Sequence, residues 1–222
     1  MTRAFIVGNG PSLAHTNLDL LVGEVSFATN RISLIYDKTD WRPTHYVRSE
    51  GPELMGLPHY SLWEDDIRYH VGNPDIEVWC NFHFLQYVDI EGGNTSGLKT
   101  CTHYLSQFDD PYSPFMWHLP YICSYGSSVH VAMQIAVTKG YGPLYLIGCD
   151  LGYSDKSPSH FTEEYEVGYE DMLQPATAAN LNMLNAHMIA LRSSPVPIYN
   201  ATIGGSLEVY KRVDYESLFR GG

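Results

Sequence analysis

An apolar run that breaks directly into a glycine turn, at the start of the chain, most restricts what this sequence can fold into. Residues 4–7 have the length of a buried strand. The next five residues are Gly8, Asn9, Gly10, Pro11 and Ser12. The proline suits the first position of a helix, and the serine adds a hydroxyl to its first turn. Such a strand, turn and helix start form an anion site, because N–H groups and the positive end of the helix dipole face the ligand. The expected ligand is the phosphate of a nucleotide.

The turn differs from both common nucleotide-binding motifs. It lacks the third glycine of the dinucleotide fingerprint, and no Gly-Lys-Ser/Thr follows it as in a P-loop. A tight turn that merely ends the first strand is therefore the plain alternative. Asn9 favours a ligand site, because an amide at the carboxyl end of the first strand lies where open α/β sheets bind their ligands.

The composition favours a folded protein whose partner is not nucleic acid. Hydrophobic residues make up 44% of the 222 residues, which is enough for a substantial core in one domain. The formal net charge is −12, from 13 basic and 25 acidic residues, which argues against nucleic acid or an anionic membrane as the partner. Any phosphate must therefore be held locally, by backbone N–H groups and few cations.

No targeting or membrane segment is evident in the sequence. It has neither a run of about eighteen apolar residues nor the apolar stretch of a secretory signal, so we expect no membrane span and a cytoplasmic location. The four cysteines are widely spaced and form no Cys-x-x-Cys pair, which predicts buried, reduced thiols rather than a zinc site. They are Cys80, Cys101, Cys123 and Cys149.

Helix and strand patterns alternate along the chain, which predicts an α/β fold. Short apolar runs predict strands at residues 4–7, 25–28, 46–47, 76–80, 144–147 and 197–200. Helical patterns cover residues 13–22, 32–36, 129–137 and 178–191. We expect a Rossmann-like, mostly parallel sheet with helices on both faces, because helical crossovers of this kind join parallel strands.

Three segments fall outside this alternation. Residues 92–121 have no clear period, and we interpret them as an insertion or lid beside the binding site. Residues 151–171 are polar and acidic; we interpret them as a lid segment, with a solvated surface as the alternative. The tail, residues 207–219, mixes apolar and charged residues and is expected to pack back on the sheet. The whole chain, residues 1–222, is then one nucleotide-binding domain.

Polar residues stand where most of the predicted strands end. They are Asn9, Asn30, Arg31, Arg48, Ser49, Glu50, Asp150, Asn200 and Thr202. In a parallel sheet these ends share one edge, where a ligand binds, although each residue could also be a local turn former. Ser127 and Ser128 open the helix at 129–137 and offer hydroxyl and N–H groups to a phosphate or ribose. One of these two serines could instead be the helix N-cap.

The chain carries four motifs in order: Gly8-Asn9-Gly10-Pro11-Ser12-Leu13, Asn30, Gly126-Ser127 and Tyr145-Leu146-Ile147-Gly148-Cys149-Asp150-Leu151. Together they resemble the bacterial lipooligosaccharide sialyltransferases. They are also similar to the 6-hydroxymethylpterin diphosphokinase-like proteins of bacterial polysaccharide gene sets, and residues 199–209 resemble the end of that second group closely. The sialyltransferase resemblance implies a Rossmann-like sheet that holds a cytidine nucleotide.

The same resemblance implies roles for single residues. Those implied to contact the nucleotide are Asn9, Gly10, Asn30 and Ser127. Tyr153 is implied to hold the leaving phosphate. A histidine base is implied in a lid after the strand that ends at Asp150, and His160 is the histidine of that segment. In the diphosphokinase-like proteins a His-Phe pair follows the same strand, as His160 and Phe161 do here.

The chemistry of His160 supports this role independently. An unperturbed imidazole titrates near neutrality, so it can accept the proton of an acceptor hydroxyl at working pH. Its place beside Asp150 and Tyr153 supports such a role, and a surface or packing histidine is the open alternative. His187 is the rival, but its position in the helix at 178–191 suits packing better.

Three functions fit these observations. The first, slightly favoured, is a glycosyltransferase that moves a sugar from a nucleotide donor, of the CMP type, to a hydroxyl acceptor without a tightly bound cofactor or a required metal. The second is a diphosphokinase that uses ATP and Mg²⁺, with Asp150 and the acidic residues 163–171 as ligands. The third is a non-catalytic nucleotide-binding module in surface polysaccharide biosynthesis. A homo-oligomer is compatible with all three.

The predicted nucleotide site gathers these residues into one set, with His160 as the catalytic residue. The nucleotide-binding members are Gly8, Asn9, Gly10, Ser12, Asn30, Arg31, Ser127, Ser128, Gly148, Asp150 and Tyr153. The proposition that they share one edge of the sheet is the part of the prediction that a structure tests most directly.

Overall fold

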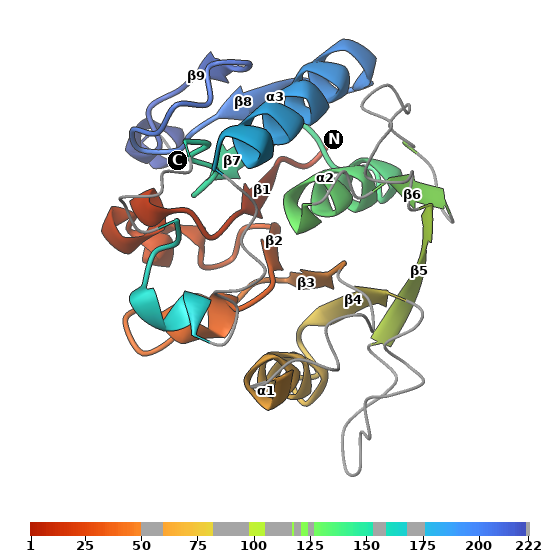
Figure 1. The fold of residues 1–222 in the computed structure, drawn as a ribbon, viewed down its shortest axis with the longest axis vertical. Helices are drawn as coiled ribbons and strands as arrows, with labels where there is room; N and C mark the ends of the chain where they lie inside the picture. The colour runs from red at the N-terminus through yellow and green to blue at the C-terminus, as the bar shows by residue number, and fades with distance from the viewer. Residues whose placement is uncertain are drawn as a thin grey trace.

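The computed structural model describes residues 1–49, 60–81, 98–104, 117, 121–123, 127–152, 159–167 and 176–220. Within these residues a nine-stranded sheet has the order β6-β5-β4-β3-β2-β1-β7-β8-β9, and all neighbouring strands run parallel (Figure 1). The strands are β1 (Ala4–Val7), β2 (Ser26–Thr29), β3 (His45–Arg48), β4 (Glu77–Asn81), β5 (Leu98–Tyr104), β6 (Tyr121–Cys123), β7 (Leu144–Ile147), β8 (Ile198–Asn200) and β9 (Lys211–Arg212).

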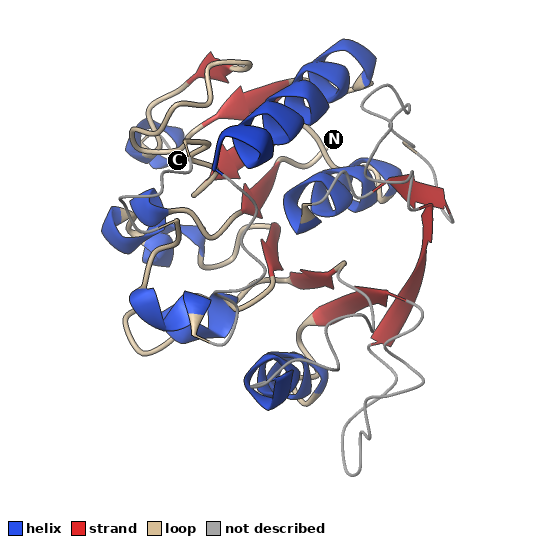
Figure 2. Cartoon of the chain, in the orientation of Figure 1, coloured by secondary structure: helices blue, strands red, loops and turns tan. Residues whose placement is uncertain are grey.

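Helices cover both faces of this sheet (Figure 2). α2 (Ser128–Thr138) and α3 (Ala176–Ser193) lie on one face, while α1 (Tyr60–Val71) and several 3-10 helices lie on the other. The 3-10 helices are η1 (Pro11–His15), η2 (Leu18–Leu21), η3 (Ile32–Ile35), η7 (Glu163–Glu166) and η9 (Glu216–Phe219). None of the described helices combines the length and the apolar character needed to cross a membrane. The predicted Rossmann-like α/β architecture is confirmed.

The central strands are buried on both faces, which explains their continuous apolar runs. In β1, Ala4 and Ile6 belong to the apolar layer under α2 and α3, and Phe5 and Val7 belong to the opposite layer. β1 pairs with β2 on one side and with β7 on the other. The strand that leads into the Gly-Asn-Gly turn therefore lies inside the sheet rather than at its edge.

The helix predicted after the two serines is α2. Ser127 is its N-cap, and the Ser127 hydroxyl accepts a hydrogen bond from the backbone N–H of Val129 at 3.3 Å. Lys139 is the C-cap that follows the last helical residue, Thr138, and Gly140 comes next with a φ of +85°. The alternative that one of the serines is an N-cap is thus correct for Ser127.

The first predicted helix, at residues 13–22, is wrong as a single element. η1 and η2 occupy this stretch instead, and the chain is extended at Thr16 and Asn17 between them. The Asn17 side chain accepts a hydrogen bond from the Asp19 N–H at 3.2 Å, which starts η2 afresh. Such local side-chain bonds compete with a continuous helix, and this is the physical reason for the break.

No strand was predicted in residues 92–121, the segment interpreted as an insertion or lid, and the structure has strands there. β5 lies within this segment, and β6 begins at its last residue, so the sheet continues beyond β4. The β5 sequence has β-branched threonines but few apolar residues, and for this reason no apolar run marked it as a strand. α1 was likewise not predicted.

The tail packs back on the sheet, as expected. Val209 packs against the layer under α2 and α3, while Val213, Leu218 and Phe219 pack against the opposite layer. Near the other end of the chain, Arg3 donates from Nη1 to the Leu218 carbonyl oxygen at 2.8 Å. The first strand and the tail are therefore joined directly.

Candidate functional site

Two glycines bring the ends of β1 and β7 into backbone contact. The Gly8 N–H donates to the Ile147 carbonyl at 2.8 Å, and a Cβ on Gly8 would lie 2.7 Å from the Gly148 carbonyl oxygen. Gly148 has a φ of +62°, and a Cβ there would lie 2.8 Å from the Gly8 carbonyl oxygen. Any side chain at either position would collide with backbone, so both glycines are explained by this close approach.

The carboxylate of Asp150 lies at the start of η1. Asp150 Oδ2 accepts a hydrogen bond from the Ser12 hydroxyl at 2.8 Å, and the Ser12 N–H lies 3.2 Å from Oδ1 and 3.3 Å from Oδ2. Burial raises the pKa of Asp150, and the bonds from Ser12 act in the opposite direction. A Cβ on Gly10 would overlap this carboxylate. Asp150 thus takes the place at the helix start that the sequence assigned to a phosphate.

Two further N–H groups of this turn, those of Gly10 and Leu13, are also bonded within the protein. The Gly10 N–H donates to the Gly148 carbonyl at 2.8 Å, and the Leu13 N–H donates to the Gly10 carbonyl at 3.0 Å. The expectation that free N–H groups at Gly8, Gly10 and Ser12 hold an anion therefore does not match this geometry. These residues, with Gly148 and Asp150, do lie together at the carboxyl ends of β1 and β7.

Asn9 turns toward β2. Its Nδ2 donates to the carbonyl oxygen and to the hydroxyl of Thr29, at 2.9 and 3.0 Å. The side chain is 9% exposed, and its Oδ1 accepts no hydrogen bond within the described part of the chain. A buried acceptor without a donor is costly, so it is a place where a ligand donor would be bound favourably.

Asn30, Ser49 and Ser128 continue this polar arrangement from β2 to β3 and α2. The Ser128 hydroxyl donates to Asn30 Oδ1 at 2.8 Å, and it lies 2.5 Å from the Ser49 hydroxyl. The Ser49 N–H donates to Ser128 Oγ at 3.3 Å. Asn30 has a φ of +51°, a left-handed conformation that Asn tolerates better than most residues. The strand ends and the start of α2 therefore converge, as predicted.

Arg31 has a different position from its neighbours in the predicted set. Its Nη1 donates to the carbonyl oxygens of Glu164 and Tyr165, both at 2.8 Å, and its Nε lies 3.7 Å from Asp66 Oδ2. Burial raises the pKa of Asp66 to about 6, against the opposing influence of the Ser33 hydroxyl and of the nearby arginines. The buried guanidinium thus joins η3, α1 and residues 163–166.

His160 lies in a segment that contacts the turn. Its ring stacks on the ring of Tyr165, with centroids 3.8 Å apart and planes 12° from parallel. The neighbouring Phe161 N–H donates to the Asn9 carbonyl at 3.1 Å. His160 is therefore the immediate sequence neighbour of a residue that contacts the Gly-Asn-Gly turn. Tyr153 lies outside the described residues.

The remaining predictions concern histidine, cysteine and metal. His187 is buried in α3, with the Tyr210 hydroxyl 3.1 Å from its Nδ1 and the ring of His130 beside it, which confirms that it packs in the core.

Three of the four cysteines are buried free thiols, as predicted: Cys80, Cys123 and Cys149. The side chain of Cys101 lies outside the described part. No group of three or more His, Cys, Asp and Glu side chains in the described residues is arranged to hold a metal ion.

Three residues that matter here were not predicted from the sequence. Asp66 lies in the unpredicted α1, and Tyr165 lies in the acidic segment for which the sequence predicts a lid or a solvated surface. Arg212 lies in the tail, and no pattern indicated its contacts with a loop that precedes it. All three act through contacts distant in sequence, for which a single sequence carries little signal.

The sequence matches no protein-family model and no curated protein. Comparison of structures is more informative. The fold is similar to those of two solved glycosyltransferases. One is the MAf glycosyltransferase from Magnetospirillum magneticum AMB-1, with a TM-score of 0.55, 14% sequence identity and 97% of this chain covered. The other is the sialyltransferase CstII from Campylobacter jejuni in complex with cytidine-5'-monophosphate (CMP), with a TM-score of 0.55, 16% identity and 96% of this chain covered.

The extent of these matches differs between the two proteins. This chain covers 85% of CstII but only 34% of the MAf glycosyltransferase, about a third of that protein's length. At such identities the likeness concerns the fold. It shows a shared Rossmann-like architecture and not a shared reaction, since one fold serves many reactions.

Proposed function

We propose that this protein is a glycosyltransferase that binds a cytidine nucleotide sugar at the carboxyl ends of β1, β2 and β3 and transfers the sugar to a hydroxyl acceptor. The observation that carries the proposal is the buried Oδ1 of Asn9, an acceptor that has no donor in the described residues. Asn9 bonds to Thr29, and the next residue, Asn30, accepts a hydrogen bond from Ser128 at the start of α2. The fold likeness to two glycosyltransferases, one of them a CMP complex, supports it.

The polar groups suggest how the nucleotide lies. Asn9 Oδ1 requires a donor, which a ribose hydroxyl or the amino group of cytosine supplies and an ionised phosphate does not. The Asp150 carboxylate at the start of η1 repels a phosphate there. We therefore place the phosphate at the start of α2, near Ser127 and Ser128, where the helix dipole and the proton of the Ser127 hydroxyl favour it.

The acceptor side of the proposal rests on His160. It would take the proton of the acceptor hydroxyl, a role that typically contributes about 10²–10⁴-fold to the rate. Its segment lies against the turn through the Phe161–Asn9 hydrogen bond, and the Tyr165 ring holds the imidazole by stacking. Tyr153, which the family resemblance links to the leaving phosphate, and a lid formed by residues 151–171 complete the proposed site.

A panel of nucleotides tests which reaction class is right. We expect CMP to raise the melting temperature in the presence of EDTA, because ligand binding to the folded state stabilises it. A shift given only by ATP with Mg²⁺ would favour the diphosphokinase reaction instead. Binding of CMP without transfer from any CMP sugar, across a panel of hydroxyl acceptors, would favour a non-catalytic module.

The role of His160 is tested by its replacement. In the transfer assay that the panel identifies, His160→Ala should lower the rate by about 10²-fold or more with little change in CMP affinity. His15→Ala is the matched control, because His15 is exposed in η1. An unchanged rate in His160→Ala would remove His160 from the mechanism without removing nucleotide binding.

A further inference from the structure

A loop between β8 and β9, residues 202–207, contacts the backbone around Asp150. The Cys149 N–H donates to the Thr202 hydroxyl at 3.1 Å, while the N–H groups of Ser206 and Leu207 donate to the Asp150 carbonyl at 2.6 and 3.1 Å. A Cβ on Gly205 would lie 2.6 Å from that same carbonyl oxygen. The loop therefore fits against the strand end from which the Asp150 carboxylate projects.

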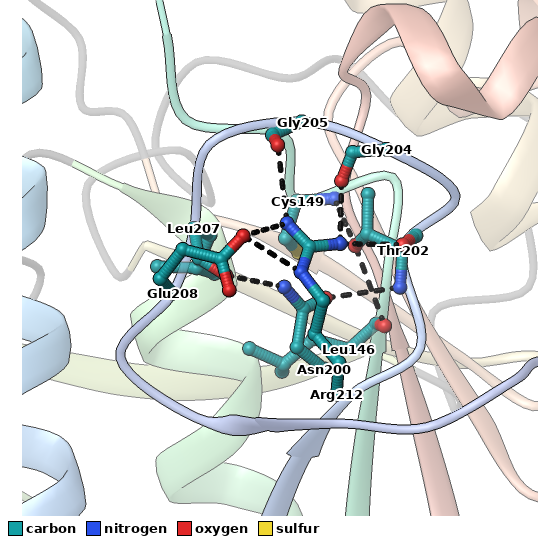
Figure 3. Close-up of polar contacts among 9 residues, drawn as sticks. All are labelled: Leu146, Cys149, Asn200, Thr202, Gly204, Gly205, Leu207, Glu208 and Arg212. Atoms are coloured by element: carbon teal, nitrogen blue, oxygen red, sulfur yellow. Dashed lines mark hydrogen bonds and ion pairs between the residues drawn. The ribbon is translucent and has the colours of Figure 1, made fainter.

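Arg212 braces this loop from within (Figure 3). Its Nη1 donates to the carbonyl oxygens of Thr202 and Gly204 at 3.1 and 2.6 Å, and its Nη2 donates to the Gly205 carbonyl at 3.1 Å. Glu208 pairs with the same guanidinium at 2.7 Å. A planar guanidinium with several donors can serve all of these acceptors at once, which a lysine cannot do.

Asn200 ties together the two ends of the loop. Its Oδ1 accepts from the Thr202 N–H at 2.9 Å, and its Nδ2 donates to the Leu207 carbonyl at 2.6 Å. Asn200 is fully buried at the end of β8 (Figure 3). Asn200 thus fixes the two ends of the loop to β8, and Arg212 binds the carbonyl groups of Gly204 and Gly205 between them.

The backbone that the loop contacts has an unfavourable conformation at Leu151. Leu151 has a φ of +47°, in the left-handed region that residues with a side chain rarely adopt. Its carbonyl accepts a hydrogen bond from the Ser206 N–H at 3.1 Å. A strained residue persists only where its surroundings over-determine it, and this loop supplies those contacts.

We infer that the Arg212-braced loop, residues 202–207, is a positioning element of the nucleotide site; this inference rests on the proposed function. The loop holds the Asp150 backbone, the Asp150 carboxylate holds Ser12 and lies against Gly10, and the turn so formed presents Asn9. Arg212 does not touch the nucleotide in this arrangement. It acts through Asp150.

The first test compares two arginines in the same kind of ion pair. Arg212 pairs with Glu208, and Arg220 pairs with Glu216 at 2.5 Å; both pairs are spaced i,i+4, but Arg220 is 72% exposed and braces no such loop. With CMP titrated well below each melting temperature, Arg212→Gln should bind CMP roughly tenfold more weakly, the equivalent of about one or two lost hydrogen bonds. Arg220→Gln should bind as the wild type does.

The second test uses two glycines with the same backbone conformation. Gly23 and Gly205 have φ values of +83° and +70°, but a Cβ on Gly23, which lies outside the loop, meets nothing within 4 Å, whereas one on Gly205 meets the Asp150 backbone. Both alanine variants carry the conformational strain, and only Gly205→Ala should also weaken CMP binding. This pair keeps the inference testable if Arg212→Gln does not fold.

Hydrogen exchange at the Ser12 N–H separates this inference from the proposed function. Arg212→Gln and Gly205→Ala should exchange that amide faster than their matched controls, whether or not CMP binds to the wild type. If the wild type does not bind CMP, the proposed function fails and the exchange rates alone decide the inference. Unchanged Ser12 exchange, or unchanged CMP affinity in variants of a wild type that binds, would overturn it.

Discussion

At the scale of single residues, Asp150 explains why the glycine turn looks like an anion site. The turn and helix start do hold an anion, but it is a carboxylate of the same chain. Ser12 gives it both its N–H and its hydroxyl. From the sequence, Asp150 and Ser12 could be assigned to the same site. The hydrogen bond between them could not be predicted, because they are 138 residues apart.

The pair can be measured by a double-mutant cycle. Ser12→Ala should lower the free energy of unfolding by about 1–2 kcal/mol, because it removes a hydrogen bond to a charged group. In Asp150→Asn the same substitution should cost clearly less, since the two residues are coupled. Urea denaturation of the four proteins checks this. Additive effects would show that the Ser12–Asp150 contact contributes nothing to stability.

His187 gives a prediction for pH. Burial lowers its pKa from 6.5 to about 3, so the unfolded chain binds the proton first as the pH falls. The stability that His187 contributes is therefore complete above about pH 6.5 and is lost progressively toward pH 3. Between pH 6 and 4, His187→Asn should reduce the slope of stability against pH by about 1.4 kcal/mol per pH unit. An unchanged slope in His187→Asn would contradict a buried, neutral imidazole at this position.

At the scale of elements, predictability followed the burial of each strand. β1 and β7 lie inside the sheet and carry continuous apolar runs, so their positions could be predicted to within a residue. β5 carries threonines without such a run, and α1 is rich in charged and polar residues, so neither was found. The break between η1 and η2 depends on one Asn side chain, which a periodic pattern does not report.

The contact between β1 and β7 can be tested with alanine. Gly8→Ala should destabilise the protein by roughly 2–3 kcal/mol or more, because the new Cβ meets the rigid Gly148 carbonyl. Gly23→Ala is the comparison: its φ is +83° and its Cβ would meet nothing within 4 Å, so it should cost only about 1 kcal/mol of strain. Equal losses in thermal or urea unfolding would contradict the close approach of the two strands.

At the scale of the whole molecule, the candidate site is assembled from segments that span almost the entire chain. The convergence of Asn9, Asn30 and Ser128 could be predicted, because the carboxyl ends of parallel strands meet at one edge. The role of Arg31 could not, since its partners come from α1 and residues 163–166. The polar groups that stay available to a ligand depend on contacts between distant segments, and a single sequence does not show these contacts.

The most direct test of a nucleotide site at this edge is calorimetric titration of CMP in EDTA into the wild type and two matched variants. Asn9→Leu removes the buried Oδ1 acceptor, whereas Asn73→Leu changes a partly exposed Asn in the loop before β4, at the other end of the strands. We predict saturable binding to the wild type and to Asn73→Leu, and at least roughly tenfold weaker binding to Asn9→Leu. Absence of binding to the folded wild type, or equal affinity in Asn9→Leu, would contradict the account.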